Sequence, residues 1–149
     1  MENLIKKDLL IITLPLLLIA GCTKATVEYF KDENGIMYLE YNGNPNTQRP
    51  FTGEIVEHYE EKDGGLKKNK GSYKDGKLDG LYNLWYKSGK KWFQKNYKDG
   101  KLDGLSIFWD REEILDTEDT YKDGELILKR CFDLEGNVCE CSDLGRGCK

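Results

Sequence analysis

Five cysteines are the most reactive side chains of this 149-residue chain, and four of them lie near its end. These four are Cys131, Cys139, Cys141 and Cys148. In an exported chain, an even number of cysteines predicts two disulfides, and all three ways of pairing four thiols are open. Residues 132–138 carry a Glu-Gly turn signal and predict a hairpin, so Cys131 could reach either Cys139 or Cys141. A zinc site is the alternative, but the spacing lacks the Cys-x-x-Cys pair of zinc knuckles.

The other groups that could catalyse a reaction are one histidine and many carboxylates. His58 is expected at the surface, with Glu57 on the opposite face of the same strand. No serine lies in a nucleophile elbow and the chain has no phosphate-binding loop. Several aspartates sit next to glycines, where the local hydrogen bonds of turns account for them; they are Asp75, Asp79, Asp99 and Asp103. The sequence therefore predicts a non-enzymatic protein with no catalytic residue, metal or cofactor.

Cys22 differs from the other cysteines because it follows an apolar segment at the N-terminus. Lys6 and Lys7 precede apolar residues 9–20, a run shorter than the roughly 20 residues of a membrane span and typical of a signal peptide. Residues 18–22, Leu-Ile-Ala-Gly-Cys, resemble the lipobox of bacterial lipoproteins, in which the cysteine thiol accepts diacylglycerol. We expect a palmitate-bearing Cys22 to hold the protein on a membrane. By resemblance to the sorting rules of double-membrane bacteria, Thr23 in place of an aspartate after Cys22 favours the outer membrane or cell surface. The alternative to a lipid-bearing Cys22 is a plain buried thiol behind an ordinary signal.

The composition favours hairpins and argues against nucleic acid as a partner. Sixteen glycines, nine tyrosines and three tryptophans suit β-hairpins better than helices. The net charge is only −4 at pH 7, so no basic field exists to attract nucleic acid or a strongly anionic membrane. The expected mature chain has the size of one domain.

A repeat with a spacing of 24 residues occupies the middle of the chain. The segment YKDGKLDGL of residues 73–81 recurs at residues 97–105, and YKDG begins a third time at Tyr121. A looser copy starts at Pro50; its Gly53 precedes Gly80 by 27 residues, which implies a three-residue insertion near residues 63–65. Each copy reads strand, turn, strand, turn, because Asp-Gly and Ser-Gly supply the positive φ that tight hairpins need.

Alternation along the predicted strands divides the large side chains between two faces. One face takes Leu81, Trp85, Leu105, Ile107 and Trp109, and the other takes Tyr82, Leu84, Tyr86 and Phe108. We expect the Leu/Ile/Trp face to form the core. Tyrosine and tryptophan are enriched at recognition surfaces, so four rings are candidate binding residues, although most rings should pack across strands. The four are Tyr82, Tyr86, Trp92 and Phe108.

The elements PFTG, YKDGKLDG and YKSGK resemble MORN repeats, in the bacterial variety associated with antitoxins of toxin and antitoxin pairs. The resemblance covers about residues 38–141. It implies an all-β fold, an elongated and twisted antiparallel β-meander of stacked hairpins, and it supplies no catalytic residues. The chain departs from the pattern where Arg111-Glu112-Glu113 replaces the Ser-Gly turn and where the last copy drifts after Gly124.

These observations predict four segments and one leading function. The segments are a signal peptide at 1–21, a tether with one opening hairpin at 22–46, hairpin repeats at 47–130 and a disulfide-rich cap at 131–149. The leading function is an envelope-anchored lipoprotein that acts as a protein–protein interaction scaffold. Alternatives are cell-wall glycan or choline binding between aromatic rings, lipid binding at the membrane surface, and antitoxin-like inhibition of a partner protein. The sequence leaves the partner and the oligomeric state open.

Overall fold

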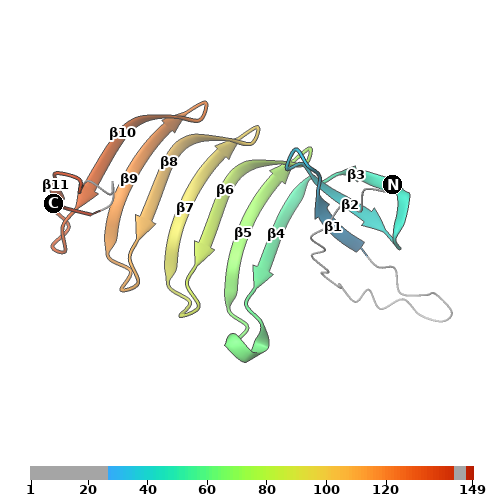
Figure 1. Cartoon of the computed structure of the whole chain (residues 1–149), viewed down its shortest axis with the longest axis horizontal. Coiled ribbons are helices and arrows are strands. Elements are labelled where there is room, and N and C mark those ends of the chain that lie inside the picture. Colours follow the sequence, from blue (N-terminus) through green and yellow to red (C-terminus); the bar gives the residue numbers. More distant parts are fainter. Residues whose placement is uncertain (1–26, 143–146) are drawn as a thin grey trace, which may run out of the picture. The chain divides into compact units, whose positions relative to one another are not determined.

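The computed structural model describes residues 27–142 and 147–149, and its regular structure is β apart from one 3-10 turn at Glu61–Asp63 (Figure 1). The strands follow one another in chain order within two antiparallel sheets. The prediction of an all-β antiparallel meander is therefore confirmed. The predicted signal peptide and Cys22 lie outside the described residues. Within the described part, no helix is long and apolar enough to cross a membrane.

The chain divides into two compact units, and the first ends at Thr52. It holds a three-stranded sheet of β1 (Val27–Lys31), β2 (Met37–Tyr41) and β3 (Asn44–Pro50). We expected one opening hairpin ending at residue 46. That boundary is wrong, because Asn42 and Gly43 adopt φ angles of 52° and 64° and turn the chain into a third strand that continues to Pro50.

The first unit has a small core of its own. Met37 and Phe51 are each 7% exposed, and the Tyr29 ring meets the Phe51 ring edge-on at 5.0 Å. The unit also includes the turn Lys74–Lys77. The Gly76 carbonyl accepts a hydrogen bond from the Met37 amide at 2.7 Å, and the Gly76 amide donates to the Phe51 carbonyl at 2.8 Å. A Cβ at Gly76 would lie only 2.8 Å from the Met37 carbonyl, so this approach requires glycine.

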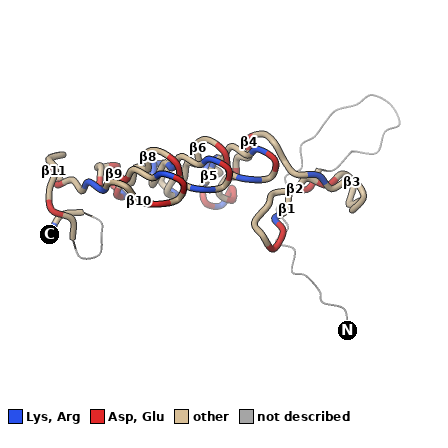
Figure 2. The backbone as a smooth tube through the Cα atoms, turned by 90° about the horizontal axis from the view of Figure 1, so that it is seen from above, with Lys and Arg blue, Asp and Glu red and all other residues tan. Residues whose placement is uncertain are grey.

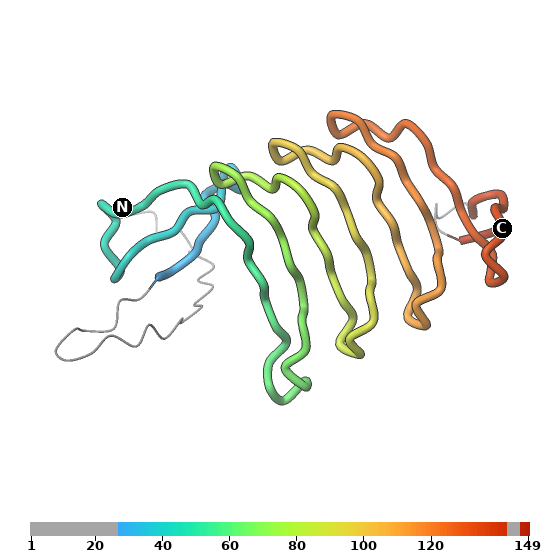
Figure 3. The backbone as a smooth tube through the Cα atoms, turned by 180° about the vertical axis from the view of Figure 1, so that it is seen from behind, coloured from blue at the N-terminus to red at the C-terminus, as the bar shows by residue number. Residues whose placement is uncertain are grey.

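The second unit is an eight-stranded sheet with the strands side by side in the order β4 to β11 (Figures 1 and 3). The strands are β4 (Gly53–His58), β5 (Lys67–Lys74), β6 (Lys77–Trp85), β7 (Lys91–Lys98), β8 (Lys101–Trp109), β9 (Leu115–Lys122), β10 (Glu125–Phe132) and β11 (Val138–Cys139). Tight turns at residues 99–100 and 123–124 form one edge. The connections at residues 59–66, 86–90 and 110–114 form the opposite edge, which we call the far edge (Figure 3).

The predicted turns recur with the same backbone geometry. Asp99 and Gly100 adopt φ angles of 49° and 83°, and Asp123 and Gly124 adopt 52° and 94°. Two successive positive φ angles define the type I′ turn, whose twist matches that of the flanking strands. The insertion was also placed correctly, because the connection from β4 to β5 contains the additional 3-10 turn.

A β-bulge recurs once in each repeat near the far edge. Leu84 pairs with Phe93 and Trp85 pairs with Lys91, so Trp92 is the unpaired residue of the bulge. The ladder skips Lys68 and Asp116 in the same way. These residues share the 24-residue spacing of the repeat. A bulge redirects the side chain of its unpaired residue. Each of the three repeats therefore has one side chain near the far edge that departs from the alternation of its strand.

The assignment of the core face was wrong. The most buried residues of the second unit all lie on the side that carries Tyr82, Phe93 and Phe108, which we call the ring face. They are Ile55, Asn69, Tyr73, Ser106, Thr117, Asp119 and Cys131. On the opposite side, Leu81 is 43% exposed. Broad rings that lie over small neighbours cover the backbone better than a single row of leucines does, and alternation alone does not reveal this.

Tyrosines and glycines face each other across the strands of the ring face. The pairs are Gly53 with Tyr73, Gly80 with Tyr97, and Gly104 with Tyr121. A glycine opposite a tyrosine leaves room for the ring to lie over the backbone. The Tyr73 ring is 8% exposed, and burial, assisted by Tyr82 and Glu57, raises the Tyr73 pKa to about 12.

Two of the turn aspartates join successive repeats instead of closing their own turns. The Asp79 carboxylate accepts a hydrogen bond from the Asp99 amide at 3.2 Å, 20 residues away. Asp103 accepts in the same way from the Asp123 amide at 3.4 Å and pairs with Lys122 at 2.8 Å. Hydrogen bonding from Lys122 lowers the Asp103 pKa. The explanation by local turn bonding was therefore wrong for Asp79 and Asp103, whose partners lie one repeat away.

The C-terminal cysteines form disulfides that crosslink the end of the sheet. Residues 132–138 form the expected hairpin, in which Phe132 pairs with Val138. Disulfides join Cys131 to Cys141 and Cys139 to Cys148. Cys131 is completely buried, and its ladder partner Cys139 bonds elsewhere, so strand pairing alone would have suggested the wrong disulfide.

Candidate binding surfaces of the sheet

The four predicted binding rings belong to one continuous network on the ring face. Tyr86 stacks on Trp92 with 5.3 Å between centroids and 22° between planes, and Trp92 lies 5.5 Å from Phe93. Phe93 also contacts Phe108 at 5.7 Å and Tyr82 at 6.0 Å. Tyr82 and Phe108 therefore cover the sheet, whereas Tyr86 and Trp92 lie near the far edge. Phe93 was not among the predicted binding residues, although it directly follows Trp92 in the sequence.

A lysine, a serine and an aspartate occupy neighbouring positions on three adjacent strands, and these are residue types that a catalytic site would use. Ser106 pairs with both Lys95 and Asp119. The Lys95 ammonium instead lies over the Phe93 ring at 4.6 Å, and burial lowers the Lys95 pKa. Ser106 is completely buried and its hydroxyl has no hydrogen-bond partner among the described residues. A nucleophile needs an accessible oxygen and a bonded base, so we assign this row to packing.

The far edge holds a cavity of about 440 Å³ lined by aromatic and basic side chains, which we call the Tyr86 pocket. Its lining is Tyr59, Tyr86, Lys87, Ser88, Trp92 and Arg111. Five of these residues come from three successive connections, after β4, β6 and β8, and Trp92 comes from the start of β7. The volume lies within the range of small-ligand sites. The lining contains no carboxylate.

Hydrogen bonds to the neighbouring hairpin fix two of the pocket's rings. The Tyr59 hydroxyl donates to the Trp85 carbonyl at 2.8 Å, and the Tyr86 hydroxyl donates to the Trp109 carbonyl at 3.1 Å. Because the phenol groups are engaged with the backbone, the rings present their faces and edges to a ligand. The Lys87 ammonium pairs with Asp63 at 3.1 Å and lies 5.9 Å from the Tyr59 ring.

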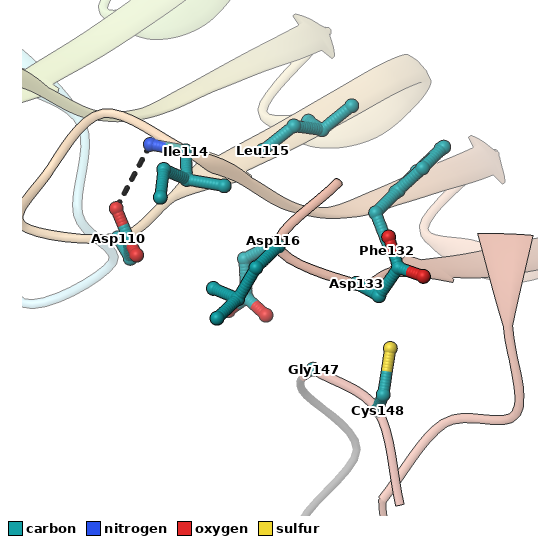
Figure 4. A pocket seen from close by; sticks show the side chains of 9 residues that line it. Asp110, Ile114, Leu115, Asp116, Phe132, Asp133, Gly147 and Cys148 are labelled. Carbon is teal, nitrogen blue, oxygen red and sulfur yellow. Dashed lines mark hydrogen bonds between the residues drawn. The ribbon is translucent and has the colours of Figure 1, made fainter. Parts of the chain in front are cut away.

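A second cavity of about 290 Å³ lies one repeat further along (Figure 4). Asp110 and Asp116 take the places that Tyr86 and Trp92 hold in the first cavity, 24 residues earlier. The Asp110 carboxylate is engaged locally, because it accepts hydrogen bonds from the Glu112 and Ile114 amides at 2.9 and 2.8 Å. The described residues contain no cluster of three or more side chains suited to hold a metal ion. We therefore treat this cavity as part of the turn.

The side opposite the ring face carries an uncovered apolar surface, which we call the leucine face. It consists of Leu81, Trp85, Leu105, Ile107, Trp109 and Leu128. Leu81 is 43% exposed and Leu128 is 48% exposed. Amides lie between the apolar side chains, because Leu81 pairs with Asn96 and Ile107 with Gln94.

The chain matches no family model, no curated protein and no solved structure. Its function is therefore argued from the two surfaces of the sheet and from the chemistry of its residues.

Proposed function

We propose that the chain is a non-enzymatic interaction module of the bacterial cell envelope, and that its leucine face docks a partner protein. The observation that carries the proposal is the exposure of this face. Leu81 on β6 is 43% exposed and Leu128 on β10 is 48% exposed, although both are large apolar side chains. Exposed apolar patches bounded by polar residues mark interaction sites.

The charge pattern of the leucine face supports a protein partner in preference to lipid headgroups. Two of its cations are paired, because Lys70 bonds Glu54 at 3.0 Å and Arg130 bonds Glu118 at 3.0 Å, and a third, Lys91, lies over the Trp109 ring at 5.3 Å. Basic and acidic residues also alternate along the backbone of the sheet (Figure 2). An apolar centre with a neutral polar rim is typical of protein interfaces, whereas anionic headgroups require unpaired cations.

The anchor and the repeat class belong to the same proposal. The lipobox-like sequence before Cys22 supports covalent attachment to a lipid, and the resemblance to MORN repeats supports a scaffold in which stacked hairpins present a long face. Two further observations support a role without catalysis: the four C-terminal cysteines are consumed in disulfides, and the single histidine, His58, is exposed in the second unit.

Site-specific photocrosslinking in the living host tests the docking face. A photoreactive amino acid at Leu105, in the centre of the face, should give a protein adduct, and the same residue at exposed Lys101 on the same strand should not. An adduct of twice the mass of the chain would identify the partner as a second copy. No adduct at Leu105, or equal adducts at both positions, would contradict the proposal. For the anchor, Cys22→Ser should abolish incorporation of labelled palmitate.

A further inference from the structure

The Tyr86 pocket has a composition that fits one class of small ligand. It combines three aromatic rings with two cations and one hydroxyl, and its lining lacks any carboxylate. We propose that this pocket binds a sugar ring that carries a carboxylate, such as a uronic acid residue of a glycan. The inference goes beyond the docking of a protein, because none of the pocket residues belongs to the leucine face.

The aromatic part of the pocket fits the apolar side of a sugar. Tyr86 and Trp92 are stacked within 22° of parallel, so each ring holds the other in place and the stack offers the flat outer face of a ring, which we call the platform. Pyranose rings have a flat C–H side that loses water when it packs on such a platform. Hydrogen bonds from the Tyr59 and Tyr86 hydroxyls to the next hairpin hold the rings in place, so little side-chain entropy is lost on binding.

The basic part of the pocket selects an anion. Arg111 extends from the turn after β8, is exposed, and makes no ion pair among the described residues. Its planar guanidinium can bind a carboxylate through two parallel hydrogen bonds. Lys87 adds a second cation that Asp63 neutralises only in part, because the side chain of Lys87 is 65% exposed.

The two cations also disfavour binding of choline, another ligand of aromatic cages. Quaternary ammonium groups bind where ring faces are free of competing positive charge. In this pocket Lys87 already lies over the Tyr59 ring, and Arg111 would repel a second cation. An acidic peptide satisfies the cations but offers no flat ring for the platform, so the sugar is favoured.

The neighbouring cavity shows that the backbone geometry alone does not create the preference. Asp110 and Asp116 replace Tyr86 and Trp92 there, and the platform is lost together with the positive charge. An acidic ligand should therefore bind at the Tyr86 pocket and be excluded from the cavity one repeat along.

Calorimetry on the purified chain in detergent tests the inference. The probe is a hexasaccharide of alternating glucuronate and N-acetylglucosamine, and chitohexaose is its neutral counterpart. We expect the acidic sugar to bind more tightly. Arg111→Gln should weaken the acidic sugar about tenfold and leave chitohexaose unchanged, because it removes one charge-assisted contact. Lys101→Gln, an exposed cation on β8, is the matched control and should change neither affinity.

Several results would overturn the inference. They are binding of neither sugar, equal binding of both, an equal loss for Arg111→Gln and Lys101→Gln, and tighter binding of hexaglutamate than of the acidic sugar. The last result would make the pocket a peptide site. Unchanged near-ultraviolet circular dichroism of Arg111→Gln excludes loss of folding as the cause. Failure here leaves crosslinking at Leu105 unaffected, so the two proposals are tested separately.

Discussion

The buried tyrosine of the ring face makes the stability of the second unit sensitive to alkali. Tyr73 is 8% exposed, and burial raises its pKa from 10.0 to about 12. The folded protein therefore holds the phenol proton more tightly than the unfolded chain does. This contribution to stability is complete below pH 10 and is lost as the pH rises toward the folded-state pKa of about 12.

The size of the effect follows from the shift. Each pKa unit corresponds to about 1.4 kcal/mol, so a shift of two units sets an upper limit of about 3 kcal/mol for Tyr73. The pKa values of Tyr82, Tyr97 and Tyr121 are also raised, chiefly by burial. Their ionisation acts in the same direction, so the total loss should exceed that of Tyr73 alone.

Urea unfolding at a series of pH values, followed by tryptophan fluorescence, measures the effect. Wild-type protein should lose stability steeply between about pH 10 and pH 12, and Tyr73→Phe should lose less, by up to about 3 kcal/mol. The difference between the two proteins removes the contribution of the lysines, which both contain. Equal losses of stability in the two proteins would refute the reasoning. So would an absorbance titration in which no tyrosine of the folded protein ionises at a higher pH than the tyrosines of the unfolded chain.

Three substitutions test other parts of the fold by urea unfolding. Gly71→Ala places a Cβ 2.8 Å from the Tyr82 ring and should cost about 1–3 kcal/mol, because the Tyr73 ring and Leu78 also crowd this Cβ at 3.2 and 3.3 Å; an unchanged midpoint would contradict the packing. Glu113→Gly relieves a φ of 71° but removes the carboxylate that accepts a hydrogen bond from the Lys91 amide at 3.1 Å, so it should stabilise by less than about 1 kcal/mol; Glu113→Gln keeps the strained backbone and should not stabilise. Cys139→Ala together with Cys148→Ala opens a short loop and should cost about 3 kcal/mol, and a loss below about 0.5 kcal/mol would assign the cap no role in stability.

Local features of the fold could be predicted from the sequence. The turn at Asp99-Gly100 depends only on residues that tolerate positive φ, and it was correctly placed. The period of the repeat, the insertion after β4 and the hairpin at residues 132–138 were also correct, because each rests on neighbouring residues. The Asn42-Gly43 signal was visible too, but its third strand required a partner strand that the sequence analysis did not assign.

Features that depend on contacts between repeats could not be predicted in the same way. The alternation of side chains correctly placed Leu81 and Tyr82 on opposite faces of the sheet. It could not show which face is buried, because burial depends on rings that lie over glycines of the next strand. The bond from the Asp99 amide to Asp79 crosses 20 residues and has no local signal. The Tyr86 pocket likewise requires Arg111 from a neighbouring hairpin. Only two of its members, Tyr86 and Trp92, were predicted as binding residues.

The repeat separates the residues that build the sheet from those that give each hairpin its chemistry. Asp-Gly turns and tyrosine–glycine pairs recur almost unchanged and fix the backbone, including a bulge at the same place in each repeat. Each bulge aims one side chain at the far edge, and its identity is free to vary without loss of strand pairing. Trp92 with Tyr86 makes an aromatic platform, whereas Asp116 with Asp110 makes an acidic turn. Recognition along this edge should therefore be set by the bulge residue and the first turn residue of each repeat, and exchanging Trp92 and Asp116 should move the sugar-binding platform away from Arg111 and weaken it.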